Sequence, residues 1–181
     1  MIWFWGAQLE IGSYPSSLII TPDGGDVTRA ADVSTSALGV DSWYIQDEGT
    51  FYTEAESVDG NNGVFAISGD PNPPGTLNYD FSSFNVQWQG AVMNGGFNPV
   101  DGSHHKFAFT ANQGSNVLFA DGSLRDTDTT TTTYPAVGLV IGNRSVFGGG
   151  PSSTHYLNGH IKRLAYFPTR KTDEQLIELT K

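Results

Sequence analysis

Two carboxylates in one predicted strand, Glu54 and Glu56, have the residue type and spacing that glycoside hydrolysis uses. The segment 49–57 reads GTFYTEAES, which suits a strand. Side chains two positions apart on a strand point to the same face, so the two Cα atoms would lie about 6.5–7 Å apart. At such a separation one carboxyl can act as the acid and the other as the nucleophile. A catalytic role is therefore one hypothesis for this strand.

The same strand face also suits sugar binding without catalysis. Sugars are held by aromatic rings that stack on their C–H surfaces, and by amides and carboxylates that bridge neighbouring hydroxyls. If the strand at 49–57 and the stretch 84–93 are neighbours, their polar faces line a concave groove. The alternative is that these are ordinary solvent-facing positions of a sheet. The predicted groove residues are Tyr52, Glu54, Glu56, Asn85, Gln87 and Gln89.

Two further ligand-binding candidates lie in loops. Trp43 is expected to be structural, whereas its neighbour Tyr44 is the better candidate for an exposed ring. His104 follows the loop NGGFNPVDGS, and His105 comes directly after it. Adjacent residues on a strand point to opposite faces, so the two histidines cannot easily bind one metal ion, even with Asp101 nearby.

No metal site or cofactor is assigned from the sequence, with structural calcium as the one candidate ion. Its ligands would come from the turns rich in Asp and Asn at 23–26, at 59–62 and at Asp101. None of these turns has the spacing of an EF-hand loop.

The elements that must position these residues are short strands. Apolar and polar residues alternate along most of the chain, and turn residues separate the alternating runs. A hairpin is expected at Asp121-Gly122, and a helix at about 173–179 with Thr172 as N-cap and Gln175 completing a capping box. The predicted strands span 49–57, 64–68 (as its return strand), 84–93, 105–110, 117–124, 139–142 and 160–167, and 126–133 is either an edge strand or a loop. The whole pattern predicts ten to twelve strands in an all-β sandwich with one short C-terminal helix.

Composition excludes several functions. The 181 residues carry a formal net charge of −10 with only nine Lys and Arg, which argues against nucleic-acid binding. There are no cysteines, so disulfides and thiolate metal sites are ruled out. No apolar run approaches the ~20 residues that span a bilayer, and the first residues lack the features of a signal peptide. No membrane insertion is expected.

Both ends of the sequence carry motifs of a known kind. Residues 5–33 read WGAQLEIGSYPSSLIITPDGGDVTRAADV, and residues 157–179 read LNGHIKRLAYFPTRKTDEQLIEL. These motifs resemble the C-terminal concanavalin A-like (laminin-G-like) lectin/glucanase domain of bacteriophage tail and tail-fibre proteins. The resemblance implies a jelly-roll sandwich of two antiparallel sheets, one of them concave, over residues 13–181. Residues 1–12 would then be a strand remnant of a preceding domain, and Trp3 and Trp5 would belong to its edge. The alternative for these two residues is a sugar-stacking platform.

The resemblance implies a function as well. It favours a non-catalytic carbohydrate-binding module on the virion surface or outside the cell, with a polysaccharide or cell-surface glycan as partner. Homo-oligomers would form through an upstream fibre. Laminarinase-like enzymes on this fold carry Glu-x-Asp-x-x-Glu, whereas this chain has Glu54-Ala-Glu56-Ser-Val-Asp59, so no enzymatic activity is expected. A fibre domain without a ligand is the first alternative, and a laminarinase-like hydrolase is the second.

Overall fold

The chain divides into two compact units, residues 1–31 and 32–181, and the second contains every residue that the structure describes. The structure is a computed structural model. It describes residues 34–37, 43–45, 47–57, 63–69, 78–80, 85–88, 91–96, 98–112, 114–131, 136–145 and 151–181. The predicted junction at 1–12, the roles of Trp3 and Trp5, and the domain start at residue 13 lie outside the described residues and stay predictions.

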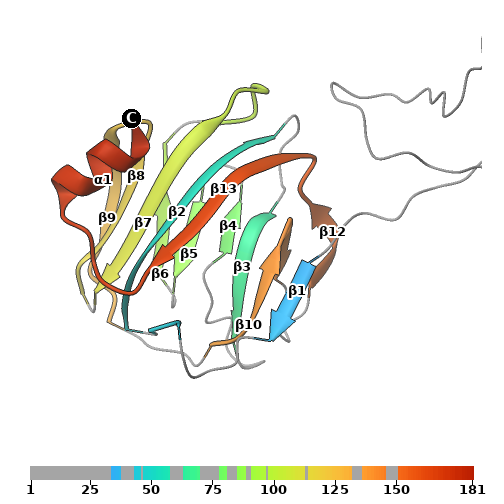
Figure 1. Ribbon diagram of the computed structural model, residues 1–181, viewed down its shortest axis with the longest axis horizontal. Coiled ribbons are helices and arrows are strands. Elements are labelled where there is room, and N and C mark those ends of the chain that lie inside the picture. Colours follow the sequence, from blue (N-terminus) through green and yellow to red (C-terminus); the bar gives the residue numbers. More distant parts are fainter. Residues whose placement is uncertain are drawn as a thin grey trace, which may run out of the picture. The chain divides into compact units, whose positions relative to one another are not determined.

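Two antiparallel sheets form the body of the second unit (Figure 1). One sheet has six strands in the order β1 (Ser34–Ala37), β10 (Ala136–Ile141), β3 (Gly63–Gly69), β4 (Asn78–Asp80), β5 (Asn85–Trp88) and β6 (Ala91–Asn94). The other has five strands in the order β13 (Gly159–Phe167), β2 (Glu48–Ser57), β7 (His105–Asn112), β8 (Asn116–Ala120) and β9 (Ser123–Asp128). A separate ribbon pairs β11 (Asn143–Ser145) with β12 (Pro151–Tyr156). The expected all-β sandwich of antiparallel sheets is confirmed.

The main hydrophobic core lies between the two sheets. Its side chains come from alternate positions of the central strands, as the period of two along a strand requires. Each fully buried Phe, Leu or Met contributes about 1.5–3 kcal/mol through removal of its apolar surface from water. The five-stranded sheet contributes Phe51, Ala55, Phe107, Phe109 and Leu118, and the six-stranded sheet contributes Val64, Val86 and Met93.

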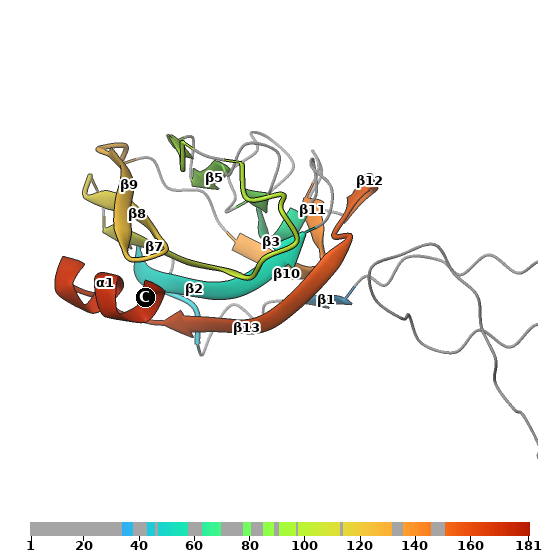
Figure 2. The ribbon, with the colours of Figure 1, turned by 90° about the horizontal axis from the view of Figure 1, so that it is seen from above.

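A helix, α1 (Asp173–Thr180), packs on the opposite face of the five-stranded sheet (Figure 2). Thr172 accepts the backbone N–H of Gln175, and the Gln175 side chain accepts the backbone N–H of Thr172, which forms the predicted capping box. Leu176 is fully buried in a second apolar cluster. Figure 2 shows β2 and β13 as arcs whose hollow side faces β3 and β5, so α1 lies on the convex side. Within the described part of the chain, no helix is long and apolar enough to cross a membrane.

The predicted hairpin between β8 and β9 is confirmed. Asp121 and Gly122 have φ values of 47° and 74°, as a two-residue type I′ turn requires. The stretch 126–133 was predicted as an edge strand or a loop. Its first three residues form the end of β9, which is the edge strand of the five-stranded sheet.

Two predictions about strand pairing are wrong. The strand after β2 was expected to return beside it, but β3 belongs to the other sheet and pairs with β10 and β4. The stretch 84–93 was expected to alternate as one run, but it forms the paired strands β5 and β6. Val86 pairs with Met93 across this hairpin, and both side chains are fully buried. Because directly paired residues of neighbouring strands share a face, this pairing makes Met93 a core residue.

Candidate functional site

The two candidate carboxylates lie side by side on β2, on the face turned away from the main core. Phe51 and Ala55 of the same strand enter that core, so Glu54 and Glu56, which lie at the alternate positions, point to the outer, convex side. Glu54 is 9% exposed and Glu56 is 2% exposed, which is unusual for ionisable side chains. A buried charge needs a charged or hydrogen-bonding partner, and both carboxylates have one.

Glu56 contacts a histidine on either side of its strand. Its Oε1 lies 2.7 Å from His160 Nδ1 on β13, and its Oε2 lies 3.3 Å from Nε2 of His104, the residue directly before β7. Figure 1 shows β2 between these two strands. The His160 and His104 side chains are 53% and 43% exposed, so the imidazoles separate the carboxylate from solvent. Glu56 therefore joins three strands of the sheet.

Glu54 is paired with an ammonium group. Lys162 Nζ on β13 donates a hydrogen bond of 2.6 Å to Glu54 Oε1, and this bond lowers the pKa of Glu54 below its ordinary value. A glycosidase acid needs the opposite shift, because it must hold its proton near neutral pH. The predicted pair of carboxylates is present on one strand face, but its partners suit a structural role better than proton transfer.

Tyr52, the third predicted residue on this face, is covered. It is 3% exposed and belongs to the cluster of Ala108, Val117, Phe119 and Leu176 beneath α1. The Arg163 guanidinium lies over its ring, 5.4 Å from the centroid. Burial raises the pKa of its hydroxyl. Tyr52 is therefore unavailable for stacking on a sugar, because its ring is buried in the cluster beneath α1. The alternation of the strand could not predict that a helix would cover this face.

The predicted groove between the two polar rows does not form. It required the strand of Glu54 to lie beside the strand of Asn85 and Gln87, but β2 and β5 belong to different sheets. The face of β2 that carries Glu54 is also the one turned away from the core, and Figure 2 shows that this side of the strand is convex. Asn85 and Gln87 flank the buried Val86 in β5, and Gln89 lies outside the described residues. Their role in binding stays a prediction.

The exposure of Trp43 and Tyr44 is the reverse of what the sequence predicted. Tyr44 packs against the main core, with its ring centroid 6.2 Å from Phe51 and 5.6 Å from Tyr166. Trp43 is 41% exposed. The prediction of an exposed Tyr44 ring is wrong, because the ring packs against Phe51 and Tyr166. Trp43 packs on Tyr166 as well, but it keeps a large part of its surface exposed.

The two adjacent histidines point to opposite faces, as predicted. His104 contacts Glu56, whereas His105 lies between two carboxylates, 2.8 Å from Asp121 and 3.2 Å from Asp101. Asp101 also accepts the backbone N–H of Ser103, which holds the pKa of Asp101 below its ordinary value. Among the residues that the structure describes, no group of three His, Cys, Asp or Glu side chains is arranged to hold a metal ion. The candidate calcium turns at 23–26 and 59–62 lie outside the described residues.

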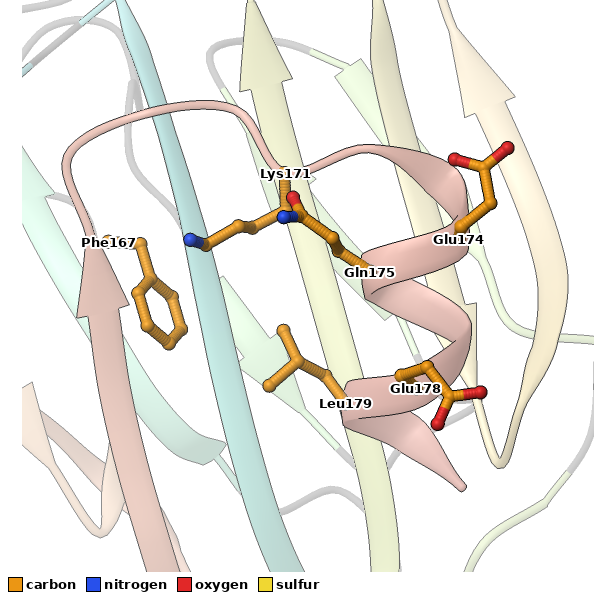
Figure 3. Close-up of a pocket in the computed structure, with 6 residues that line it drawn as sticks. All are labelled: Phe167, Lys171, Glu174, Gln175, Glu178 and Leu179. Atoms are coloured by element: carbon orange, nitrogen blue, oxygen red, sulfur yellow. The ribbon is translucent and has the colours of Figure 1, made fainter.

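A shallow pocket of about 390 Å³ opens between α1 and the end of β13 (Figure 3). Phe167 and Leu179 provide its apolar lining, and Glu174, Gln175 and Glu178 come from the helix. Lys171 Nζ lies 4.6 Å from the centroid of the Phe167 ring, so a cation of the chain itself already contacts the aromatic ring. Sequence analysis did not predict this pocket, since it depends on how the helix packs against β13.

Comparison with known proteins places the fold. No family model and no curated protein sequence matches the chain. Solved structures do match. The carbohydrate-binding module CBM40 of the Ruminococcus gnavus IT-sialidase, bound to α2,3-sialyllactose, has a TM-score of 0.59 and 12% identity over 75% of this chain and 84% of that one. A pentraxin from Limulus polyphemus has a TM-score of 0.56 and 15% identity over 83% and 82% of the two chains. Domain 4 of a Geobacillus stearothermophilus arabinanase, in complex with arabinotriose, has a TM-score of 0.57 and 12% identity over 75% and 68%. These similarities establish a lectin-like jelly-roll sandwich.

Proposed function

We propose that this domain binds carbohydrate without catalysis, through the outer face of its six-stranded sheet. The observation that carries the proposal is the fold. Its solved neighbours include a carbohydrate-binding module bound to sialyllactose and an arabinanase domain bound to arabinotriose. Because the identities are low, the proposal also needs an argument from the residues of this chain.

The chemistry of the two outer faces favours the six-stranded sheet. The outer face of the five-stranded sheet is convex, α1 covers part of it, and Glu54 and Glu56 are already paired there. On the six-stranded sheet, β5 carries Asn85 and Gln87 on either side of the core residue Val86. Successive residues of a strand alternate between its two faces, so Asn85 and Gln87 occupy positions on the face opposite to that of Val86. Amides donate and accept hydrogen bonds at once, as recognition of neighbouring sugar hydroxyls requires.

A glycan array, probed with and without calcium, tests this function. We expect retention on a subset of glycans, and loss of that retention in Asn85→Ala and Gln87→Ala. Asn112→Ala is the matched control, because Asn112 is an exposed amide on β7 of the other sheet, and it should bind as the unaltered protein does. Equal binding by all four proteins would refute the location of the site, and a blank array would refute the function. Loss of binding on calcium removal would reveal a structural or bridging ion.

The biological setting that we propose is a bacteriophage tail or tail fibre. The support is the resemblance of residues 5–33 and 157–179 to the ends of such domains, and the second of these segments forms β13 and α1. The labelled domain should then bind bacterial cells and lose binding when their surface polysaccharide is removed. A blank array combined with self-association in sedimentation would favour a structural fibre domain instead. Release of reducing sugar, abolished by Glu54→Gln, would favour the laminarinase-like alternative.

A further inference from the structure

Trp43 is an exposed tryptophan that lies outside the binding face proposed on the six-stranded sheet. It precedes β2 and is 41% exposed, beside Ile45 at 49%. Large aromatic side chains usually bury most of their surface, because each removes a large apolar area from water when it packs. The exposed fraction of the Trp43 side chain is therefore high for its residue type, which makes the surroundings of the indole of interest.

The indole is held in place by the core. Tyr44 and Tyr166 meet it in edge-to-face contacts, with centroid distances of 5.9 and 5.4 Å and interplanar angles of 68° and 74°. The Tyr166 hydroxyl in turn accepts the backbone N–H of Ile45 at 2.8 Å and lies 3.2 Å from the Ile45 carbonyl oxygen. Neither tyrosine ring lies parallel to the indole. These contacts fix the orientation of the indole, and neither of them is a parallel stack.

Two polar groups of the same segment interact electrostatically, namely the Tyr44 hydroxyl and the Asp47 carboxylate. Burial, together with the nearby Tyr166 and Asp47, raises the pKa of the Tyr44 hydroxyl, so it stays protonated and can donate a hydrogen bond. Asp47 is exposed, and its carboxylate can accept one. Within the described residues, neither the Tyr44 hydroxyl nor the Asp47 carboxylate has a hydrogen-bond partner. An oriented aromatic ring with a free donor and a free acceptor nearby matches what a pyranose presents, namely an apolar C–H face edged by hydroxyls.

We propose that Trp43, Tyr44 and Asp47 form a second carbohydrate-contact site, which takes one pyranose ring by stacking on the indole. This inference rests on the proposed carbohydrate-binding function but uses a different surface. Trp43 lies beside Tyr166 of β13, in the five-stranded sheet, whereas the binding face proposed above is the outer face of the six-stranded sheet. Two contacts on one glycan chain would raise the affinity of a long polysaccharide over that of a short oligosaccharide.

Saturation-transfer difference NMR tests the site, with methyl β-D-galactopyranoside and methyl β-D-glucopyranoside as probes. Both sugars present a continuous C–H face on one side of the ring. We expect saturation transfer from the protein to the ring protons of that face for at least one probe. Trp43→Ala should weaken the Kd by about tenfold, which corresponds to about 1.4 kcal/mol, while Trp43→Phe should recover part of the loss. Ile45→Ala is the matched control, because Ile45 is equally exposed in the same segment, and it should leave the signal unchanged.

Several results would overturn this site. They are absence of transfer to both probes, equal transfer in Trp43→Ala and the unaltered protein, or loss of transfer in Ile45→Ala to the same extent. Thermal unfolding of each variant guards against a folding defect, and Trp43→Phe keeps the test valid if Trp43→Ala is unstable. The outcome for Trp43 does not depend on whether the six-stranded sheet binds glycans. Glycan-array binding that Gln87→Ala abolishes and Trp43→Ala leaves intact would refute the second site and preserve the proposed function.

Discussion

Replacement of Leu176 by Ala tests the physical account of the outer face of the five-stranded sheet. Leu176 belongs to α1, and its side chain is fully buried against the sheet in the cluster with Tyr52, Ala108 and Phe119. Deleting a buried Leu side chain removes its transfer free energy and leaves a cavity, at a total cost of about 2.7–5 kcal/mol. The domain's free energy of unfolding is of the order of 5–15 kcal/mol, so the variant should still fold. We expect a loss of about 3–4 kcal/mol and a fall in Tm of about 6–16 °C.

Urea denaturation followed by circular dichroism measures this loss as a lower midpoint with an unchanged m-value. Leu124→Ala is the matched control, because Leu124 lies on β9 of the same sheet but is 51% exposed. Its free energy of unfolding should change by less than about 0.5 kcal/mol. A loss below about 1 kcal/mol for Leu176→Ala would refute the reasoning. Such a result would mean that α1 does not bury Tyr52 in solution, and the outer face of β2 would again be a candidate binding surface.

Two further predictions concern the contacts between β2 and β13. The first tests the pair of Glu54 and Lys162, and the second tests the close approach of Gly159 to the β2 backbone. The pKa of Glu54 is lowered by Lys162, so the stability from this pair is fully present above the ordinary value of 4.5 and is lost as pH falls through the lowered value. Glu54→Gln should therefore lose less stability than the unaltered protein as the pH falls below 4.5, and Lys162→Met should do the same. Parallel curves of stability against pH for all three proteins would contradict the pairing. Separately, Gly159→Ala would place a Cβ atom 2.0 Å from the Glu56 carbonyl oxygen, so we expect a loss of at least about 3 kcal/mol in urea denaturation. Gly96→Ala is the matched control, because a Cβ atom at Gly96 meets nothing within 4 Å, and it should cost only about 1–2 kcal/mol from the positive φ of this residue. Equal losses of stability in Gly159→Ala and Gly96→Ala would exclude a steric clash at Gly159.

Local pattern was a sound guide to the elements. The alternation in β2 and β7 predicted which residues share a face, because successive side chains on a strand point in opposite directions. The Asp121-Gly122 turn and the Thr172 cap were likewise predicted, since each depends on residues within a few positions of one another. The break between β5 and β6 was missed, because a short turn inside an apolar run leaves only a weak signal.

The candidate site was harder to predict than the elements. The pairing of Glu56 with His160 joins residues 104 positions apart, and that of Glu54 with Lys162 joins residues 108 apart. Contacts at this separation follow from which strand lies beside which, and no local pattern carries that information. The same reason explains why Tyr52 was predicted as a binding residue.

The sequence by itself determined the class of this protein: an antiparallel β-sandwich with a capped C-terminal helix, an acidic surface and no cysteine chemistry. Only the tertiary structure decided which faces remain available to a ligand. In the sequence, a strand such as β2 looks the same whether a second sheet, a helix or solvent covers each of its faces. Burial of Tyr52 under α1 and exposure of Trp43 beside Tyr166 follow from the packing of segments distant in sequence. That packing turns attention from the carboxylates of β2 to the six-stranded sheet and to Trp43.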